Sequence, residues 1–274
     1  MNNLHRELAP ISDAAWDQIE EEAARTLKRY LAARRVVDVP EPKGPALAAV
    51  STGHTQTIES PGESVQAVRR AANALVELRV PFKLTRQAID DVERGAEDSD
   101  WSPLKEACRK IAFTEDRAVF DGWAAARIGG IRPSASKKAL ALPAAAMGYP
   151  AVVAQAVNQL RLAGCNGPYR LVLGADPFTA ISGGSEEGYP VLQHIQRLVD
   201  GEIVWAPAIA GGLVLTTRGG DFKLDLGQDI SIGYLGHTEA EVELYLQESF
   251  TFRLLTTEAA IALTAPEAEA LSSG

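Results

Sequence analysis

The sequence is poor in the residues on which metal-binding and disulfide-bonded proteins depend. Its 274 residues include only 2 cysteines and 4 histidines. Cys108 and Cys165 form no CxxC pair and are too few for a disulfide framework, so a reducing compartment is expected. The histidines are scattered, and none has a second ligand at helical spacing. We therefore expect no metal site.

Positive charge and long apolar runs are also scarce. Lys and Arg number 27 against 36 Asp and Glu, which gives a net charge of -9. A nucleic-acid binder needs a concentrated basic surface, so none is expected as a partner. No stretch approaches ~18 uninterrupted apolar residues, and the N-terminus lacks an apolar signal core. The sequence predicts a cytoplasmic protein that does not span a membrane.

Motifs that hold phosphates or present nucleophiles are absent. GxGxxG does not occur, and Gly183-Gly184 and Gly219-Gly220 lack the Lys-Ser/Thr of a phosphate loop. No nucleophile elbow presents Ser185. The acidic runs at 90–93 and 115–116 are typical of solvated helix faces. The lack of a converging acid, base or ligand set favours a scaffold over an enzyme.

Apolar periodicity predicts three helices in the first half. The first begins after Ser12, a favourable N-cap, and runs to about Arg35. A short helix is expected over 86–94. A third, with an apolar face from Leu104 to Trp123, is expected to end at Gly129-Gly130. At about 22 residues it would span roughly 33 Å, the length of a domain.

The remaining segments are rich in strand signals. A long hairpin is predicted from 46–58 and 64–80, with SPGES as its turn. Its alanine-rich part, 66–78, prefers a helix in isolation, so pairing with another subunit would have to impose the strand. After a proline-containing linker at 131–150 the pattern alternates helix and strand, and short strands follow from Gly201.

Specific motifs recur along nearly the whole chain in one order. They are MNNLHRELAPIS, AAWDQIEEEA, RRVVDV, ELRVPFKLTRQAIDDVERG, DSDW, EDRAVFDGW, LAGCNGPY, GYPVLQHIQRLVDGEIVWAPAI, TTRGGDFKLDLGQDISIGY and VELYLQESFTF. In these motifs the chain resembles the encapsulin shell proteins, also called linocin-like bacteriocins, particularly those of actinobacteria.

This resemblance implies an α+β fold of the HK97 phage major-capsid type. A peripheral domain would comprise residues 1–45, 80–132 and 228–274, an elongated loop residues 46–79, and an axial domain residues 133–227. The resemblance also implies a function. About 60 copies would close into an icosahedral nanocompartment around a cargo enzyme, a dye-decolourising peroxidase or a ferritin-like protein.

The resemblance also assigns residues to two sites. A C-terminal targeting peptide of the cargo would bind in a groove formed by Leu27, Tyr30, Leu31, Arg34, Asp38, Ile230, Ile232 and Tyr234. The five-fold pore would be lined by Ser182, Gly183, Gly184, Ser185, Glu186, Glu187 and Gly188. Gln87 stands where one type of relative has a flavin-stacking Trp, so no cofactor is expected. The tail after Leu263 is expected to be exposed.

One alternative stays open at the level of the sequence. A phage-derived major capsid protein that packages DNA would share the fold. The net charge of -9 disfavours this alternative without excluding local basic patches. The bacteriocin and peptidase labels of the family find no support, because no nucleophile and base are placed together.

Overall fold

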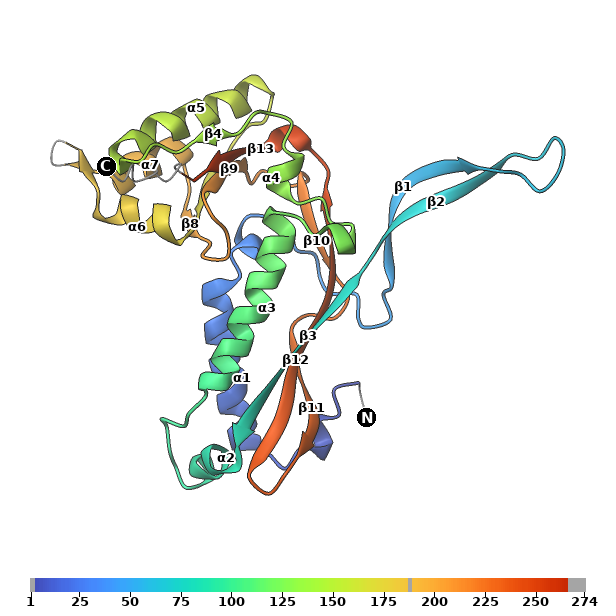
Figure 1. The fold of residues 1–274 in the computed structure, drawn as a ribbon, viewed down its shortest axis with the longest axis vertical. Coiled ribbons are helices and arrows are strands. Elements are labelled where there is room, and N and C mark those ends of the chain that lie inside the picture. Colours follow the sequence, from blue (N-terminus) through green and yellow to red (C-terminus); the bar gives the residue numbers. More distant parts are fainter. Residues whose placement is uncertain (1–2, 187–188, 266–274) are drawn as a thin grey trace, which may run out of the picture.

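The computed structural model describes residues 3–186 and 189–265. Figure 1 shows an elongated lower part, a second body at its upper end, and a hairpin that reaches away from both. The lower part packs α1 (Asp13–Tyr30), α2 (Arg86–Glu93) and α3 (Ser102–Phe120) against an antiparallel sheet. That sheet contains β3 (Val76–Thr85), β10 (Phe222–Leu226), β11 (Ser231–His237) and β12 (Glu241–Leu254).

The long strand β12 organises this sheet. β3 and β11 pair with the same part of β12, so they lie on its opposite sides, and β10 pairs with its C-terminal end. Alternate residues of β12 face the helices, and Leu244 and Leu246 are completely buried with Leu84 of β3 nearby in one core cluster. The helices complete this core through residues at the spacing that the sequence indicated, such as Ile19 and Ile111.

Helix α1 begins where the sequence predicts but ends earlier. Ser12 caps it, because its Oγ accepts a hydrogen bond from the amide of Ala15 at 3.3 Å. The prediction of a helix to Arg35 was wrong, since α1 ends at Tyr30 and residues 33–35 form a 3-10 turn. The carboxylate of Asp116 accepts the amide hydrogens of Ala32 and Ala33 at 3.1 and 2.8 Å, which replaces the next helical bonds.

Helix α3 also ends earlier than expected, at Phe120 instead of near Arg127, and Trp123 lies outside it. Gly122 has a φ of +83°, which stops the helix. A Cβ at this position would lie 2.7 Å from the carbonyl oxygen of Gly129, so two chain segments cross here in close contact. Gly129 and Gly130, which were expected to end the helix, are the partners of Gly122 in that crossing.

The second body is built on a mixed five-stranded sheet. The strands, in spatial order, are β4 (Leu140–Ala141), β13 (Ala260–Thr264), β9 (Gly212–Thr216), β5 (Tyr169–Leu173) and β8 (Ile203–Trp205). Its helices are α4 (Ile131–Ser134), α5 (Tyr149–Leu162), α6 (Ala175–Gly183) and α7 (Val191–Val199), with the short pair β6 (Ser185–Glu186) and β7 (Tyr189–Pro190). The alternation of helix and strand predicted after residue 150 is therefore confirmed.

Two strands change the domain map. β13 joins the five-stranded sheet, although the map assigned 228–274 to the peripheral domain. β10, assigned to the axial domain, pairs with β12 in the other sheet. The chain therefore crosses between the two bodies more often than motif positions indicated, and one continuous core cluster includes Phe120 of α3, Leu224 of β10 and Ile261 of β13.

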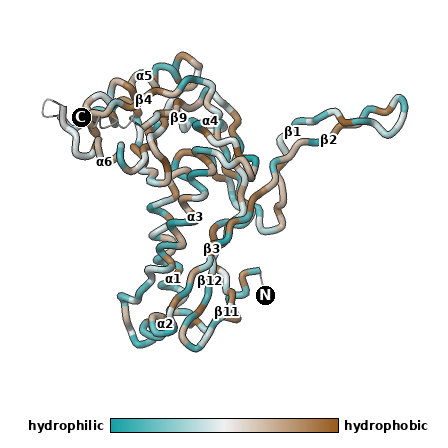
Figure 2. Tube along the Cα trace, in the orientation of Figure 1, coloured by the Kyte–Doolittle hydropathy of each residue, from teal (hydrophilic) through white to brown (hydrophobic). Residues whose placement is uncertain are grey.

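The predicted hairpin is confirmed. β1 (Ala49–Ile58) and β2 (Ala67–Ala74) pair antiparallel, with an irregularity between Ser51 and Thr55. They form a two-stranded sheet of their own and project from the body (Figure 1). Most of their residues are exposed, and Figure 2 shows apolar stretches on the hairpin as well as in the body. An isolated hairpin is marginal in water, so this segment lacks the packing it needs within one chain.

Candidate functional site

Four of the predicted cargo-peptide residues belong to or pack against the core cluster that the helices share with the antiparallel sheet. Leu27, Ile230 and Tyr234 are partly buried and pack against the same core cluster, of which Ile232 is a buried member. We call these four residues the α1–β11 strip. Near it the amide of Tyr234 donates to the carbonyl oxygen of Leu4 at 2.8 Å, which ties the N-terminal segment to β11. The strip presents apolar surface beside a strand edge.

Tyr30 and Leu31 lie next to the strip but have other partners. The ring of Tyr30 meets Phe113 of α3 edge-on, with centroids 5.6 Å apart, and lies 5.9 Å from the ring of Trp205 in β8. Arg29 stacks over the same Trp205 ring at 5.6 Å. Leu31 follows the helix end and is half-buried. These residues join α1 to α3 and to the second body.

Arg34 lies at the centre of a buried ion cluster. Its guanidinium donates through Nε and Nη2 to Glu115 of α3, the shortest distance being 2.6 Å. Nη1 donates to Asp229 at 2.7 Å and Nη2 to Glu248 of β12 at 3.2 Å. We call Arg34, Glu115, Asp229 and Glu248 the Arg34 cluster. Sequence reasoning assigned Arg34 to the cargo peptide and missed these partners within its own chain.

Burial governs the ionisation of this cluster. Burial lowers the pKa of Arg34, whereas the negative charges of Glu115, Asp229 and Glu248 raise it, Glu115 most of all. The resulting pKa lies above the ordinary value for arginine, so the guanidinium stays charged. Burial, followed by Glu115, raises the pKa of Glu248 well above 4.5. The pKa of Asp116 is also raised by burial, although the amide of Ala33 opposes the shift.

The interpretation of Glu115 and Asp116 as a solvated helix face was wrong. Both side chains are completely buried. A signal was present in the sequence, because Glu115 follows Ile111 by four residues and precedes Val119 by four, on the apolar face of α3. A carboxylate on such a face needs a buried partner, and Arg34, which supplies it, is too far away in sequence for a local pattern to reveal it.

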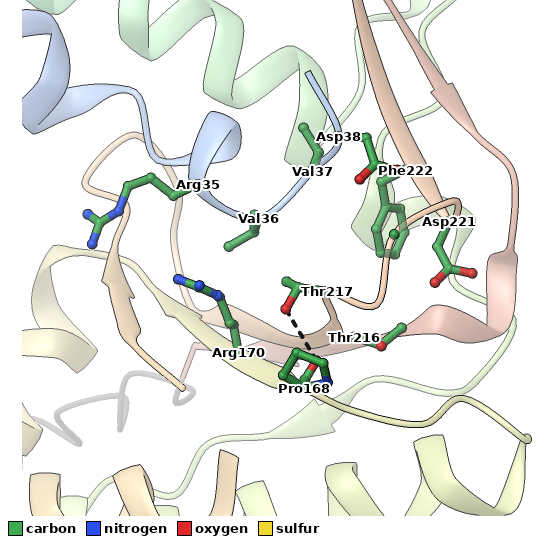
Figure 3. A pocket seen from close by; sticks show the side chains of 11 residues that line it. Arg35, Val36, Val37, Asp38, Pro168, Arg170, Thr216, Thr217, Asp221 and Phe222 are labelled. Atoms are coloured by element: carbon green, nitrogen blue, oxygen red, sulfur yellow. Dashed lines mark hydrogen bonds between the residues drawn. The ribbon is translucent and has the colours of Figure 1, made fainter. Parts of the chain in front are cut away.

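Asp38 lies apart from the α1–β11 strip. It lines a polar cavity of about 270 Å³ between the two bodies, together with residues of β9, β10 and the segment before β5. Figure 3 shows Arg35 and Arg170 on one side of this cavity and Asp38 and Asp221 on the other. Asp38 accepts a hydrogen bond from the amide of Gly220 at 2.6 Å, and both arginines pair with Glu202. Asp38 therefore fastens its segment to β10.

The predicted pore residues occupy one loop, of which only a part is described. Gly183 ends α6, and the hydroxyl of Ser182 donates to the carbonyl oxygen of Phe178 at 2.8 Å. Ser185 and Glu186 form β6, which pairs with β7. Glu187 and Gly188 lie outside the described residues, as does the tail from 266 onward. The pair of β6 and β7 lies between α6 and α7 in the chain.

Neither a metal centre nor a membrane helix is found within residues 3–186 and 189–265. No group of three or more His, Cys, Asp or Glu side chains there could hold a metal ion. In the same part of the chain, every helix is too short or too polar to cross a bilayer. Cys108 and Cys165 are buried and unpaired, and burial raises the pKa of Cys108 to about 12, so its thiol is unreactive.

The sequence matches known proteins over most of its length. The model of the family described as "Encapsulating protein for peroxidase" covers residues 1–251. The chain belongs to this family. A protein named "Type 1 encapsulin shell protein" from Mycolicibacterium paratuberculosis is 60% identical over 96% of this chain and 100% of its own. Proteins of the same name from Mycobacterium tuberculosis and Brevibacterium linens are 56% and 51% identical, with the same coverage.

Solved structures confirm the fold of this family member. A virus-like particle protein from Pyrococcus furiosus covers 90% of the chain with a TM-score of 0.64 at 13% identity. The capsid protein of the myovirus XM1 covers 86% with a TM-score of 0.51 at 10% identity. The chain therefore has the HK97-type capsid fold expected from its motifs, and it is a structural shell protein of the encapsulin family, not an enzyme.

Proposed function

We propose that copies of this chain close into a hollow icosahedral shell that encloses a cargo enzyme. The observation that carries the proposal is the hairpin of β1 and β2, which leaves the body with most of its side chains in solvent. Ile58, Val65 and Val68 on it are 45%, 56% and 57% exposed. Such a hairpin gains stability only against another surface, and a neighbouring copy in a shell supplies one.

The shell proposal is tested by shortening the hairpin. Deletion of Ser60–Glu63 removes the turn and leaves the core clusters of the body intact. The shortened chain should show the circular dichroism of a folded protein but should elute from a sizing column as small species. Particles of normal size from this variant would show that the hairpin is not needed for contacts between copies in the shell.

We propose that the α1–β11 strip receives the apolar side chains of a cargo C-terminal peptide. Its support is the partly buried apolar surface that Leu27, Ile230 and Tyr234 add around one core cluster. An extended peptide gains affinity by seating apolar anchors on a preformed surface of this kind. The family description, which names a peroxidase, favours a peroxidase as the cargo.

The variant Ile230→Asp tests this docking. A charge on the strip opposes burial of apolar anchors, so shells co-expressed with the cargo should form normally and contain little of it. Leu235→Asp is the matched control, because Leu235 lies on β11, the strand that Ile230 precedes, and is 46% exposed outside the strip. Equal loading in both variants would contradict docking at the strip.

We propose that the loop from Ser182 to Gly188 borders an opening of the shell. Five copies around an axis would gather the carboxylates of Glu186 and Glu187 into acidic rings that favour cations. The double variant Glu186→Gln, Glu187→Gln should bind fewer Tb³⁺ ions per shell than the unmodified chain. An unchanged Tb³⁺ stoichiometry would contradict the rings.

The fold alone does not separate a cargo shell from a capsid that packages DNA. The relatives at 47–60% identity carry the name of encapsulin shell proteins, and this favours the cargo shell. Purified particles treated with nuclease should have the ultraviolet spectrum of protein without nucleic acid. Protected DNA inside them would favour the alternative.

A further inference from the structure

Two carboxyl groups that belong to different elements share one guanidinium in the Arg34 cluster. Glu115 of α3 and Glu248 of β12 are completely buried, and both contact Nη2 of Arg34, at 2.6 and 3.2 Å. Two ionised carboxylates buried on one guanidinium nitrogen repel each other, and a single proton held by the pair would remove this repulsion.

The charges that face this pair do not balance. Arg34 is the cation, while Asp229 from the β10–β11 turn and Asp116 of α3 add two further carboxyl groups. Asp116 is held by the amides of Ala32 and Ala33. On the remaining side β3 places Leu78 opposite Glu248, and Arg79 donates to Gln247.

One atom of the cluster has no partner when all carboxyl groups are taken as ionised. Oε1 of Glu248 is buried and accepts no hydrogen bond from any described residue. An unsatisfied buried acceptor is costly, and a proton on this oxygen would make it a donor. The same proton would also reduce the number of negative charges around the single positive charge of Arg34.

We propose that Glu115 and Glu248 hold one proton between them at neutral pH, and that loss of this proton releases Asp229 and the beginning of β11. Two buried negative charges on one guanidinium repel the third carboxylate, Asp229, whose side chain is 47% exposed and free to move into solvent. Asp229 also accepts the amide hydrogen of Ile230 at 2.7 Å. Movement of the Asp229 side chain into solvent therefore frees the amide of Ile230, which belongs to the α1–β11 strip.

The consequence for cargo rests on the proposed function. If the strip receives the cargo peptide, the shared proton keeps the strip in the conformation that binds the peptide. Glu115 and Glu248 would not contact the peptide themselves and would act as positioning residues. Retention of cargo would then weaken as the pH rises. The proton itself and its effect on β11 are measurable without any cargo.

The proton is tested by infrared spectroscopy of the purified, cargo-free protein in D₂O between pH 5 and 9. A protonated carboxyl group absorbs apart from ionised carboxylates, and we expect absorption of this kind at pH 7 that weakens in the variant Glu248→Gln. Gln has the shape of protonated Glu and can donate to Glu115, so this variant should fold. Glu243→Gln, on the same strand but half-exposed, should keep the band. A band of equal intensity in Glu248→Gln would overturn the proposal.

The coupling to β11 is tested by hydrogen exchange on the unmodified chain. The protection of residues 229–234, divided by that of β5 as an internal reference, should fall by about tenfold per pH unit once the proton is lost. Glu248→Gln should keep the ratio constant with pH. A constant ratio in the unmodified chain would overturn the coupling. Because neither readout involves cargo, empty shells would count against the proposed docking and leave this result standing.

Discussion

Replacement of Arg34 by alanine should be among the most destabilising single changes in the chain. The variant leaves Glu115 and Glu248, both completely buried, without their cation. Removal of one member of a buried ion pair costs about 3–5 kcal/mol, because the other charge remains buried and uncompensated. With a urea dependence of about 3 kcal/mol per molar, a loss of about 3 kcal/mol lowers the unfolding midpoint by about 1 M.

The loss should grow with pH. Burial, followed by Glu115, raises the pKa of Glu248 above its ordinary 4.5 in the folded chain. The folded chain therefore binds a proton that the unfolded chain releases, and the free energy of unfolding falls as the pH rises from about 4.5 through the raised pKa. Arg34 lowers this pKa, so its removal raises it further and extends the fall to higher pH.

Urea unfolding of Arg34→Ala and of the unmodified chain at pH 5 and pH 8 measures both effects. Arg25→Ala is the matched control, since the Arg25 side chain is 72% exposed and its pair with Glu22 should contribute less than about 1 kcal/mol. A loss in Arg34→Ala no larger than in Arg25→Ala, or one that shrinks at pH 8, would refute the reasoning.

Two further changes test the core and the cysteines. Leu244→Ala removes a completely buried side chain of β12 and should cost about 2–5 kcal/mol, seen in calorimetry as a lower Tm, whereas Leu235→Ala on the exposed part of β11 should leave Tm nearly unchanged. Burial raises the pKa of Cys108 to about 12, so its thiol should not react with a thiol reagent in the folded chain at pH 8. The same thiol should react in urea. Rapid reaction without urea would show that α3 opens.

Much of the fold followed from local patterns. The Ser12 cap, the hairpin, α2 and the buried strand β5 are specified by neighbouring residues, and each was found. Errors arose where a distant residue decides the outcome. Asp116 ends α1 by taking the amides of Ala32 and Ala33, and the crossing of Gly122 with Gly129 ends α3.

The site followed the same rule. Leu27, Ile230, Ile232 and Tyr234 belong to or pack against one core cluster, and their role as a cargo site, assigned from motif positions, stays a prediction. The partners of Arg34 lie 81, 195 and 214 residues away in sequence, so no local spacing reveals them. The pairing of charges from distant elements depends on the tertiary structure, so the Arg34 cluster can be identified only in the folded chain.

Electron microscopy of the purified chain, expressed alone, tests the central claim most directly. The account predicts uniform hollow particles with icosahedral symmetry, assembled without a portal or a scaffold. Only monomers or small oligomers under these conditions would contradict it.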